Sequence, residues 1–173
     1  MQSWHIVGGI LSGILRIMHP DQYRVGYEVL QHLATVSECG DVLATWPTVF
    51  HAVSIISNRS SPLHRELKGC FPYFDLLVSV GDYSQAPLEL WPLGLQLQNS
   101  SGTICGVSGK AFLHGVAEPD GPRFCHALYM RKDLQEFVTV KPCSWMTQSV
   151  YSNSIGNHLV RQKLILDEDP FSI

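Results

Sequence analysis

The spacing of apolar residues along the chain changes near Pro47. Upstream, residues 19–36 repeat apolar side chains at intervals of three and four, which predicts a helix with one apolar face. The apolar stretch 6–15 is too short to span a bilayer, which takes about 20 residues, and we interpret it as a buried helix or loop. The apolar face of the predicted helix consists of Tyr23, Tyr27, Leu30, Leu33 and Ala34.

Downstream of Pro47 the chain breaks into short apolar runs that are separated by Gly, Pro, Asn, Asp and Ser. Seven such runs at this spacing favour a β-sandwich or a jelly roll. We therefore predict a single, mainly β (α+β) domain, with helical support in 1–45, a jelly-roll core in 46–150 and a C-terminal tail in 151–173. The predicted strands are 50–57, 73–81, 88–90, 94–98, 103–108, 111–117 and 123–130.

Length, charge and cysteine content narrow the class of protein. A chain of 173 residues, 45% of them apolar, fits one globular domain with a real core. The net charge of −3 excludes a uniformly basic surface, so a contact with DNA or RNA would need a local basic patch. The five cysteines lack CxxC spacing, which favours free thiols in a reducing compartment. We expect an intracellular protein, with the nucleus as a narrower option, and no membrane association.

The stretch SNRSSPLHREL, residues 57–67, contains a histidine and a carboxylate two positions apart, His64 and Glu66. Residues i and i+2 of an extended chain point to the same side, so both could face one metal ion. The pair is common by chance, and an exposed loop without a ligand is the alternative. His114 lies in a distant strand-like run and supplies a second imidazole. Two histidines and one carboxylate on one face form the ligand set of non-haem Fe(II) oxygenases.

Arg123 begins the last predicted strand, nine residues after His114. Its guanidinium can form a bidentate pair with the distal carboxylate of 2-oxoglutarate, whose keto-acid end chelates iron. Cys125 lies two residues further on the same face of the strand, so we expect it to line the same pocket. In the alternative interpretation, Arg123 stabilises its strand by pairing with an acid such as Glu118 or Asp120.

Several residues near the motif have two open interpretations. Asn58 and Arg59 either contact substrate or cap a strand and face solvent. Arg59, Arg65 and Lys68 form a basic group that either receives phosphates or is simply solvated. Asp75 either orients a group of the active site or faces outward from its strand.

The chain resembles the fungal 2-oxoglutarate/Fe(II) oxygenase domains related to the TET and base-J-synthesis enzymes, many of them associated with transposons. The resemblance covers roughly residues 45–150. It places His64 and Glu66 at the His-x-Asp motif of that family, His114 at its second histidine and Arg123 at its basic residue for the 2-oxoglutarate carboxylate. Glu66 departs from the family pattern by one methylene group. The segments that carry the resemblance are FHAVSIISNRSSPLHRE, YFDLLVSVGDYSQAPLEL, GTICGVSGKAFLHGV, GPRFCHALYMR and SWMTQS.

The resemblance implies a double-stranded β-helix (jelly roll, cupin-like) that holds Fe(II) and 2-oxoglutarate and uses O₂ to oxidise a C–H bond. His64, Glu66 and His114 would be the catalytic metal ligands, and Arg123 and Cys125 the cosubstrate-binding residues. The implied substrate is a methylated base in nucleic acid, such as 5-methylcytosine or N6-methyladenine. The alternative is a catalytically inactive jelly-roll binding domain or a degenerate transposon-derived remnant. The sequence does not predict the oligomeric state.

Overall fold

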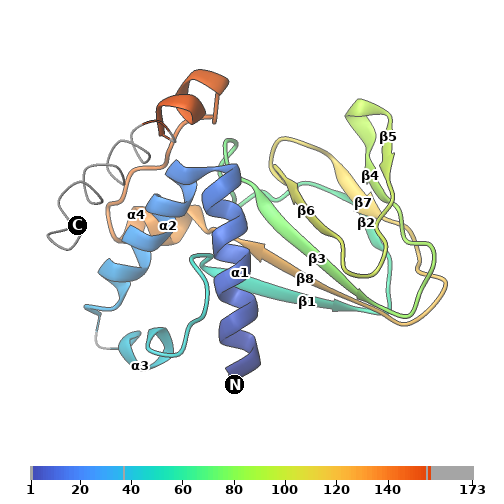
Figure 1. Cartoon of the computed structure of the whole chain (residues 1–173), viewed down its shortest axis with the longest axis horizontal. Coiled ribbons are helices and arrows are strands. Elements are labelled where there is room, and N and C mark those ends of the chain that lie inside the picture. Colours follow the sequence, from blue (N-terminus) through green and yellow to red (C-terminus); the bar gives the residue numbers. More distant parts are fainter. Residues whose placement is uncertain (1, 37, 155, 157–173) are drawn as a thin grey trace, which may run out of the picture.

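Two antiparallel sheets of four strands each form the centre of the protein (Figure 1). The computed structural model describes residues 2–36, 38–154 and 156. Sheet A consists, in spatial order, of β1 (Ala52–Ser57), β8 (Arg123–Tyr129), β3 (Asp75–Gly81) and β6 (Ile104–Val107). Sheet B consists of β2 (Ser61–His64), β7 (His114–Val116), β4 (Leu88–Leu90) and β5 (Leu95–Leu97).

The pairing of the strands is nested: β1 pairs with β8, β2 with β7, β3 with β6 and β4 with β5, all antiparallel. The β1–β8 stretch therefore follows the path of one long hairpin that is wound across two sheets, which is the topology of a double-stranded β-helix. The predicted fold class is confirmed, and each of the seven predicted strands contains an observed one. The strand that the sequence did not reveal is β2, a four-residue segment that contains Pro62 and lacks an apolar run.

Helices cover the outer face of sheet A and form the main hydrophobic core with it (Figure 1). Leu11 and Leu15 of α1 and Val29 of α2 are buried in the same cluster as Leu76 of β3 and Leu128 of β8. Because this core lies on the outer face of sheet A, the space between the two sheets is shared by a smaller cluster around Ala86, Leu88 and Val116 and by a cavity. The helices are α1 (Gln2–Met18), α2 (Pro20–Leu33), the short α3 (Gly40–Leu43), α4 (Lys132–Phe137), the 3-10 turn Trp91–Leu93 and a helical segment at 148–154.

The buried face of α2 differs from the predicted one. Of the predicted apolar stripe only Leu33 is fully buried, and Tyr27 is 51% exposed. Gly26 explains the offset, since a β-carbon at this position would lie 2.6 Å from the carbonyl oxygen of Val49, so a side chain there would hold the helix away from the core. The residues of α2 that are buried are Gln22, Val25, Gly26, Val29 and Leu33.

The apolar stretch 6–15 lies within α1, and the prediction that it is buried holds for only one side of that helix. Leu11 and Leu15 are buried, whereas Ile6 and Ile10 are more than half exposed. None of the helices in the described part of the chain is long and apolar enough to cross a membrane. The division into 1–45, 46–150 and 151–173 stays a prediction, and most of the predicted tail lies outside the described residues.

Gln22 connects the helical layer to the start of β3, and its loss should destabilise the protein. Its side-chain amide donates to the carbonyl of Phe74 at 2.8 Å and accepts from the amide of the same residue at 2.9 Å. We expect Gln22→Ala to lower the free energy of unfolding by about 2–4 kcal/mol, because two backbone groups lose their partner. Urea denaturation measures this change. Gln31→Ala, on the exposed side of α2, is the matched control and should shift the free energy by less than about 0.5 kcal/mol; equal effects of both variants would contradict the role given to Gln22.

Candidate active site

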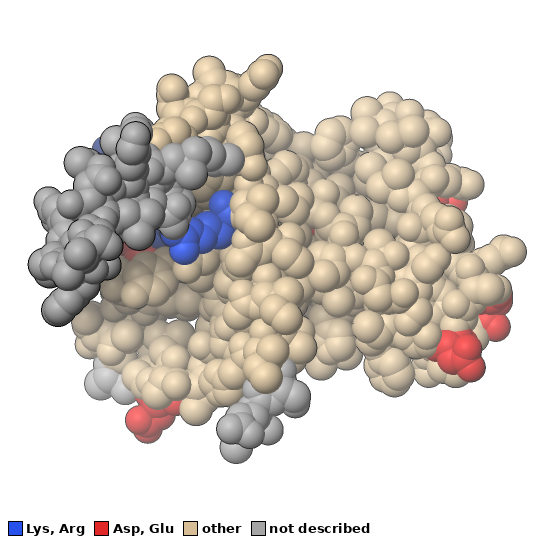
Figure 2. All heavy atoms as spheres, in the orientation of Figure 1, with Lys and Arg blue, Asp and Glu red and all other residues tan. Residues whose placement is uncertain are grey.

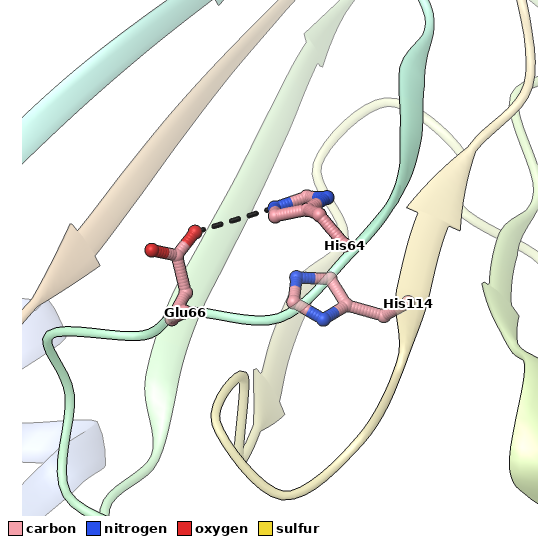
Figure 3. Close-up of side chains that lie close together, drawn as sticks. All are labelled: His64, Glu66 and His114. Carbon is pink, nitrogen blue, oxygen red and sulfur yellow. Dashed lines mark hydrogen bonds and ion pairs between the residues drawn. The ribbon is translucent and has the colours of Figure 1, made fainter.

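The two histidines of the predicted metal site are brought together by the pairing of β2 with β7. His64 ends β2 and lies opposite His114, the first residue of β7, in the antiparallel register. The centroids of the two imidazole rings are 4.4 Å apart. Glu66 follows β2, and its Oε1 lies 3.3 Å from Nε2 of His64. The dashed line in Figure 3 marks this contact. The three ligand atoms lie within 4.8 Å of one another, so small side-chain rotations bring them to one ion.

Both imidazoles are oriented in the same way by the backbone. Nδ1 of His64 contacts the carbonyl oxygen of Pro62 at 2.7 Å, and Nδ1 of His114 contacts that of Phe112 at 3.0 Å. A carbonyl only accepts, so Nδ1 carries a proton in each ring, and Nε2 is the ring nitrogen left for a metal ion, which would replace the contact of His64 Nε2 with Glu66. Burial lowers the pKa of His114, which favours the neutral, ligand form.

Next to these three residues lies a cavity of about 440 Å³ between the sheets. One side of β8 lines it, since Arg123, Cys125, Ala127 and Tyr129 alternate along the strand and face inward. His64, Glu66 and His114 line the same cavity from the other sheet and the loop after β2. The apolar side chains of Ile56, Leu77, Val116 and Ala127 also line this cavity.

Arg123 is a buried cation without an acidic partner. It is 2% exposed, its Nη2 donates to Oγ of Ser79 at 2.8 Å, and its Nε has no hydrogen-bond partner. None of the ion pairs among the described residues includes Arg123. The alternative partners proposed from the sequence are used elsewhere: Glu118 accepts from the amide of Ser60, and Asp120 accepts from the 84–85 backbone.

These observations fit the groups that the resemblance implies. The donor set of two Nε2 atoms and one carboxylate, open to a cavity on one side, suits Fe(II) and leaves coordination positions for other ligands. The unpaired buried guanidinium in the wall of that cavity suits the carboxylate of a small anionic ligand. Cys125 is 3% exposed and lies beside Arg123 on the inner face of β8, as expected from the alternation of the strand.

Asp75 faces inward, behind Glu66. It is 8% exposed, and burial first and the charge of Glu66 second raise its pKa to about 8. The backbone of Gly109 forms a hydrogen bond to its carboxylate, and a side chain at position 109 would collide with both Asp75 and Glu66. Of the two interpretations left open by the sequence, the structure therefore excludes the outward-facing one.

Of the other sequence-based candidates, only Arg59 lines the cavity. Asn58 has positive φ and exchanges hydrogen bonds with the backbone of Arg123. The part that each plays toward a substrate stays a prediction. Arg65 is exposed, and Lys68 lines a smaller cavity of about 250 Å³ that also includes Glu66 and Asp75.

Three residues of the site were not found from the sequence. Ser79 is 1% exposed and contacts Arg123; it occupies the inward side of the predicted strand 73–81, two positions after Leu77. The hydroxyls of Ser54 and Tyr129 lie 3.1 Å apart in the cavity wall. The alternation of each strand would have placed these side chains inward, but an isolated hydroxyl gives no signal of a site until the partner strand is known.

Comparison with known proteins finds both a family model and solved structures that are similar to this chain. The family model Tet_JBP, described as the oxygenase domain of the 2OGFeDO superfamily, matches residues 6–132. A solved structure, NgTET1 in complex with 5mC DNA, aligns with 76% of the chain at 17% sequence identity and a TM-score of 0.45. The chain spans about half of that protein, 49% of its length. No curated protein matches the chain.

Removal of either imidazole should abolish metal binding. We expect His64→Ala and His114→Ala each to lose Fe(II) binding, measured by anaerobic titration, because two remaining donors do not hold the ion. His32→Ala, at the exposed end of α2, is the control and should bind as the wild type does. Wild-type affinity in the His64 or His114 variant would show that the imidazoles serve the fold instead.

Asp75 should make the metal-free protein less stable as the pH rises. In the unfolded chain this acid loses its proton near pKa 3.8, whereas in the folded protein it keeps the proton until its pKa of about 8. The unfolded state therefore binds fewer protons across this window, and the free energy of unfolding falls with pH. Urea denaturation with a chelator present, at about pH 5 and about pH 7, should show a smaller fall in Asp75→Asn. Parallel pH profiles of the two proteins would contradict this assignment.

Proposed function

The chain belongs to the oxygenase domain family of the 2OGFeDO superfamily, and from this premise we propose that it is a 2-oxoglutarate- and Fe(II)-dependent dioxygenase acting on a methylated base in nucleic acid. The bases proposed are 5-methylcytosine and N6-methyladenine. The observation that carries the proposal is the unpaired cation of Arg123, which lies in one cavity with two histidines and a carboxylate. The metal held by these three residues would bind the keto-acid end of 2-oxoglutarate, and Arg123 would bind its distal carboxylate.

The charge of Arg123 needs an anion. A buried charge without a partner costs several kcal/mol, so a structure that keeps it buried is stabilised by whatever supplies the opposite charge. Ser79 satisfies one N–H of the guanidinium and holds its orientation, while Nε remains available. The distal carboxylate of 2-oxoglutarate is the expected partner, and the apolar walls formed by Ile56 and Leu77 would contact its methylene groups.

His64, Glu66 and His114 would hold the iron. When bound, Fe(II) would supply the oxidation chemistry, in which 2-oxoglutarate and O₂ are converted to succinate and CO₂ and a C–H bond is oxidised. The contribution of this chain is orientation: the carbonyls of Pro62 and Phe112 fix the two rings through Nδ1. The amide of Glu66 donates to the carbonyl of Gly109 at 3.0 Å, which fixes the backbone from which the longer carboxylate extends.

A nucleic-acid substrate is supported by where the basic residues lie. Arg59 lines the cavity, Lys68 lines the neighbouring cavity beside Glu66, and Lys110 donates to the carbonyl of Leu67 on the same loop. These cations lie on or next to the segment that contains His64 and Glu66, in a chain whose net charge is −3, and phosphates are the expected ligands of such a group. A methylated base inside a duplex would have to leave the stack to reach the metal ligands.

Succinate formation tests the proposal. The protein is incubated with Fe(II), 2-oxoglutarate and oligonucleotides that contain 5-methylcytosine, N6-methyladenine or no methyl group, and mass spectrometry follows succinate and the oxidised base. We expect turnover that a methylated oligonucleotide stimulates, its loss in Glu66→Gln, and wild-type rates in Glu28→Gln, an exposed acid of α2. Succinate formation that no oligonucleotide stimulates would reject the nucleobase as substrate and retain the proposed oxygenase activity. No succinate at all would favour the inactive jelly-roll domain.

Loss of Arg123 should weaken the binding of the cosubstrate without destabilising the fold. We expect Arg123→Ala to lose about 2–5 kcal/mol of 2-oxoglutarate affinity, because the cosubstrate carboxylate would be left buried and unpaired. Lysine should restore affinity only in part, since an ammonium lacks the planar fork. The Tm should stay or rise, because the variant removes a buried charge that has no acidic partner within the protein.

Calorimetric titration and thermal denaturation of one preparation separate the two interpretations of Arg123. Arg24→Ala, an exposed substitution on α2, controls for loss of positive charge. A lower Tm with normal 2-oxoglutarate affinity would assign Arg123 to the structure alone and remove it from the site.

A further inference from the structure

A turn at 108–112 joins the two segments that carry the proposed metal ligands. It leads from β6 into β7, whose first residue is His114. Three hydrogen bonds tie it to the segment 66–71, which follows β2, and we call residues 108–112 the ligand turn. The three bonds run from the amide of Glu66 to the carbonyl of Gly109 at 3.0 Å, from the ammonium of Lys110 to the carbonyl of Leu67 at 2.7 Å, and from the hydroxyl of Ser108 to the carbonyl of Phe71 at 2.7 Å.

Gly109 is the residue of the ligand turn that lies beside two of the proposed ligands. A β-carbon on Gly109 would lie 2.9 Å from Cγ of Glu66 and 3.3 Å from Cε1 of His114. Carbon atoms in favourable contact are about 3.5–4.0 Å apart, so a side chain at this position would push both ligands. Cε1 of His114 is bonded to Nε2, the nitrogen left for a metal ion, and Cγ of Glu66 is bonded to the carboxylate carbon. A shift of either atom therefore moves a donor atom.

The backbone conformation of Gly109 does not itself require glycine. In the described part of the chain, the glycines with positive φ are Gly81, Gly94 and Gly102. Gly109 is not among them, so an L-residue fits its φ without strain. What glycine supplies at this position is therefore space.

The ligand turn cannot move away from Glu66 to make room, because Gly109 is held on both sides. Its carbonyl accepts from the amide of Glu66, and its own backbone donates to the carboxyl of Asp75, which is 8% exposed. The carboxyl of Asp75 also borders the space that a β-carbon would fill. A side chain at position 109 would therefore be accommodated by displacing Glu66 and Asp75.

Given the metal ligands of the proposed function, on which this inference rests, we propose that Gly109 is a positioning residue of the metal site. The absence of a side chain leaves room for the methylene group through which Glu66 reaches the ion beside His114. A glutamate has one methylene group more than an aspartate, and its Cγ is the atom of Glu66 that lies beside position 109. Gly109 thus sets how closely the carboxylate and the imidazole approach each other.

Titration with Co(II) alone, followed by its visible absorption, tests this role without turnover. We expect Gly109→Ala to raise the dissociation constant at least about tenfold, because Glu66 and His114 no longer reach one ion together. Gly9→Ala, whose β-carbon would meet nothing within 4 Å, is the matched control and should bind as the wild type does. Circular dichroism and the Tm show whether each variant is folded.

The titration reports on this site because the described residues hold no second group of three side chains that could bind a metal ion together. On the face shown in Figure 2, acidic side chains are few and lie toward the edges. His64→Ala serves as the blank, since it removes one of the three donors.

A shorter side chain at position 66 separates crowding at the metal site from a general effect on the fold. In the Glu66→Asp background the extra methylene group is gone, so Gly109→Ala should raise the dissociation constant only about threefold or less. A glycine that serves the fold alone would cost the same in both backgrounds.

The same comparison decides the case in which Gly109→Ala alone does not fold, since crowding then predicts a folded double variant that binds Co(II). Wild-type affinity in Gly109→Ala, an equal loss in both backgrounds, or a double variant that does not fold would each overturn the role of Gly109 and leave the proposed function in place. Wild-type protein that binds no Co(II) would instead reject the metal site itself, and the role of Gly109 with it.

Discussion

The guanidinium of Arg123 is a full positive charge that the protein keeps in its interior without a carboxylate of its own. Two contacts hold this guanidinium in place. The backbone amide of Arg123, the first residue of β8, donates to the side chain of Asn58, and its guanidinium donates to Ser79 of β3. Under the proposed function, an anion from outside the chain balances this charge, since the cost of an unpaired buried charge exceeds that of most single substitutions. The remaining features of the site are arranged around this requirement.

The jelly roll has room for such an anion between its two sheets because its main core lies between the helices and sheet A. The helices pack on the outer face of sheet A, so the inner side chains of β8 do not have to fill a core. Nested strand pairing then places His64 opposite His114 in the other sheet, facing the same cavity. Two residues that are 50 positions apart in the sequence thus meet through hydrogen bonds of the backbone. The proposed metal ligands and Arg123 line one cavity, together with apolar side chains that suit the methylene groups of a dicarboxylate.

The sequence predicted the parts of this arrangement that depend on local alternation and motif spacing. The β-rich region, the jelly roll and the TET/JBP-like type of the family are confirmed, whereas the fungal origin and the location in the cell stay predictions. The residues named for the site lie close together, but their roles stay predictions. What could not be predicted depends on pairing across the fold: β2 contains Pro62 and becomes a strand through β7, and Ser79 joins the site through Arg123. The buried face of α2 was missed because Gly26 sets the approach of the helix.

The most direct test of the central claim is a crystal structure grown without oxygen in the presence of Fe(II) and 2-oxoglutarate. The account predicts one ion bound by Nε2 of His64, Nε2 of His114 and the carboxylate of Glu66, with the keto-acid end of 2-oxoglutarate on the ion. It also predicts that the distal carboxylate pairs with the guanidinium of Arg123, including the Nε that has no partner within the chain. An ion held elsewhere, or a cosubstrate whose distal carboxylate lies away from Arg123, would contradict the account.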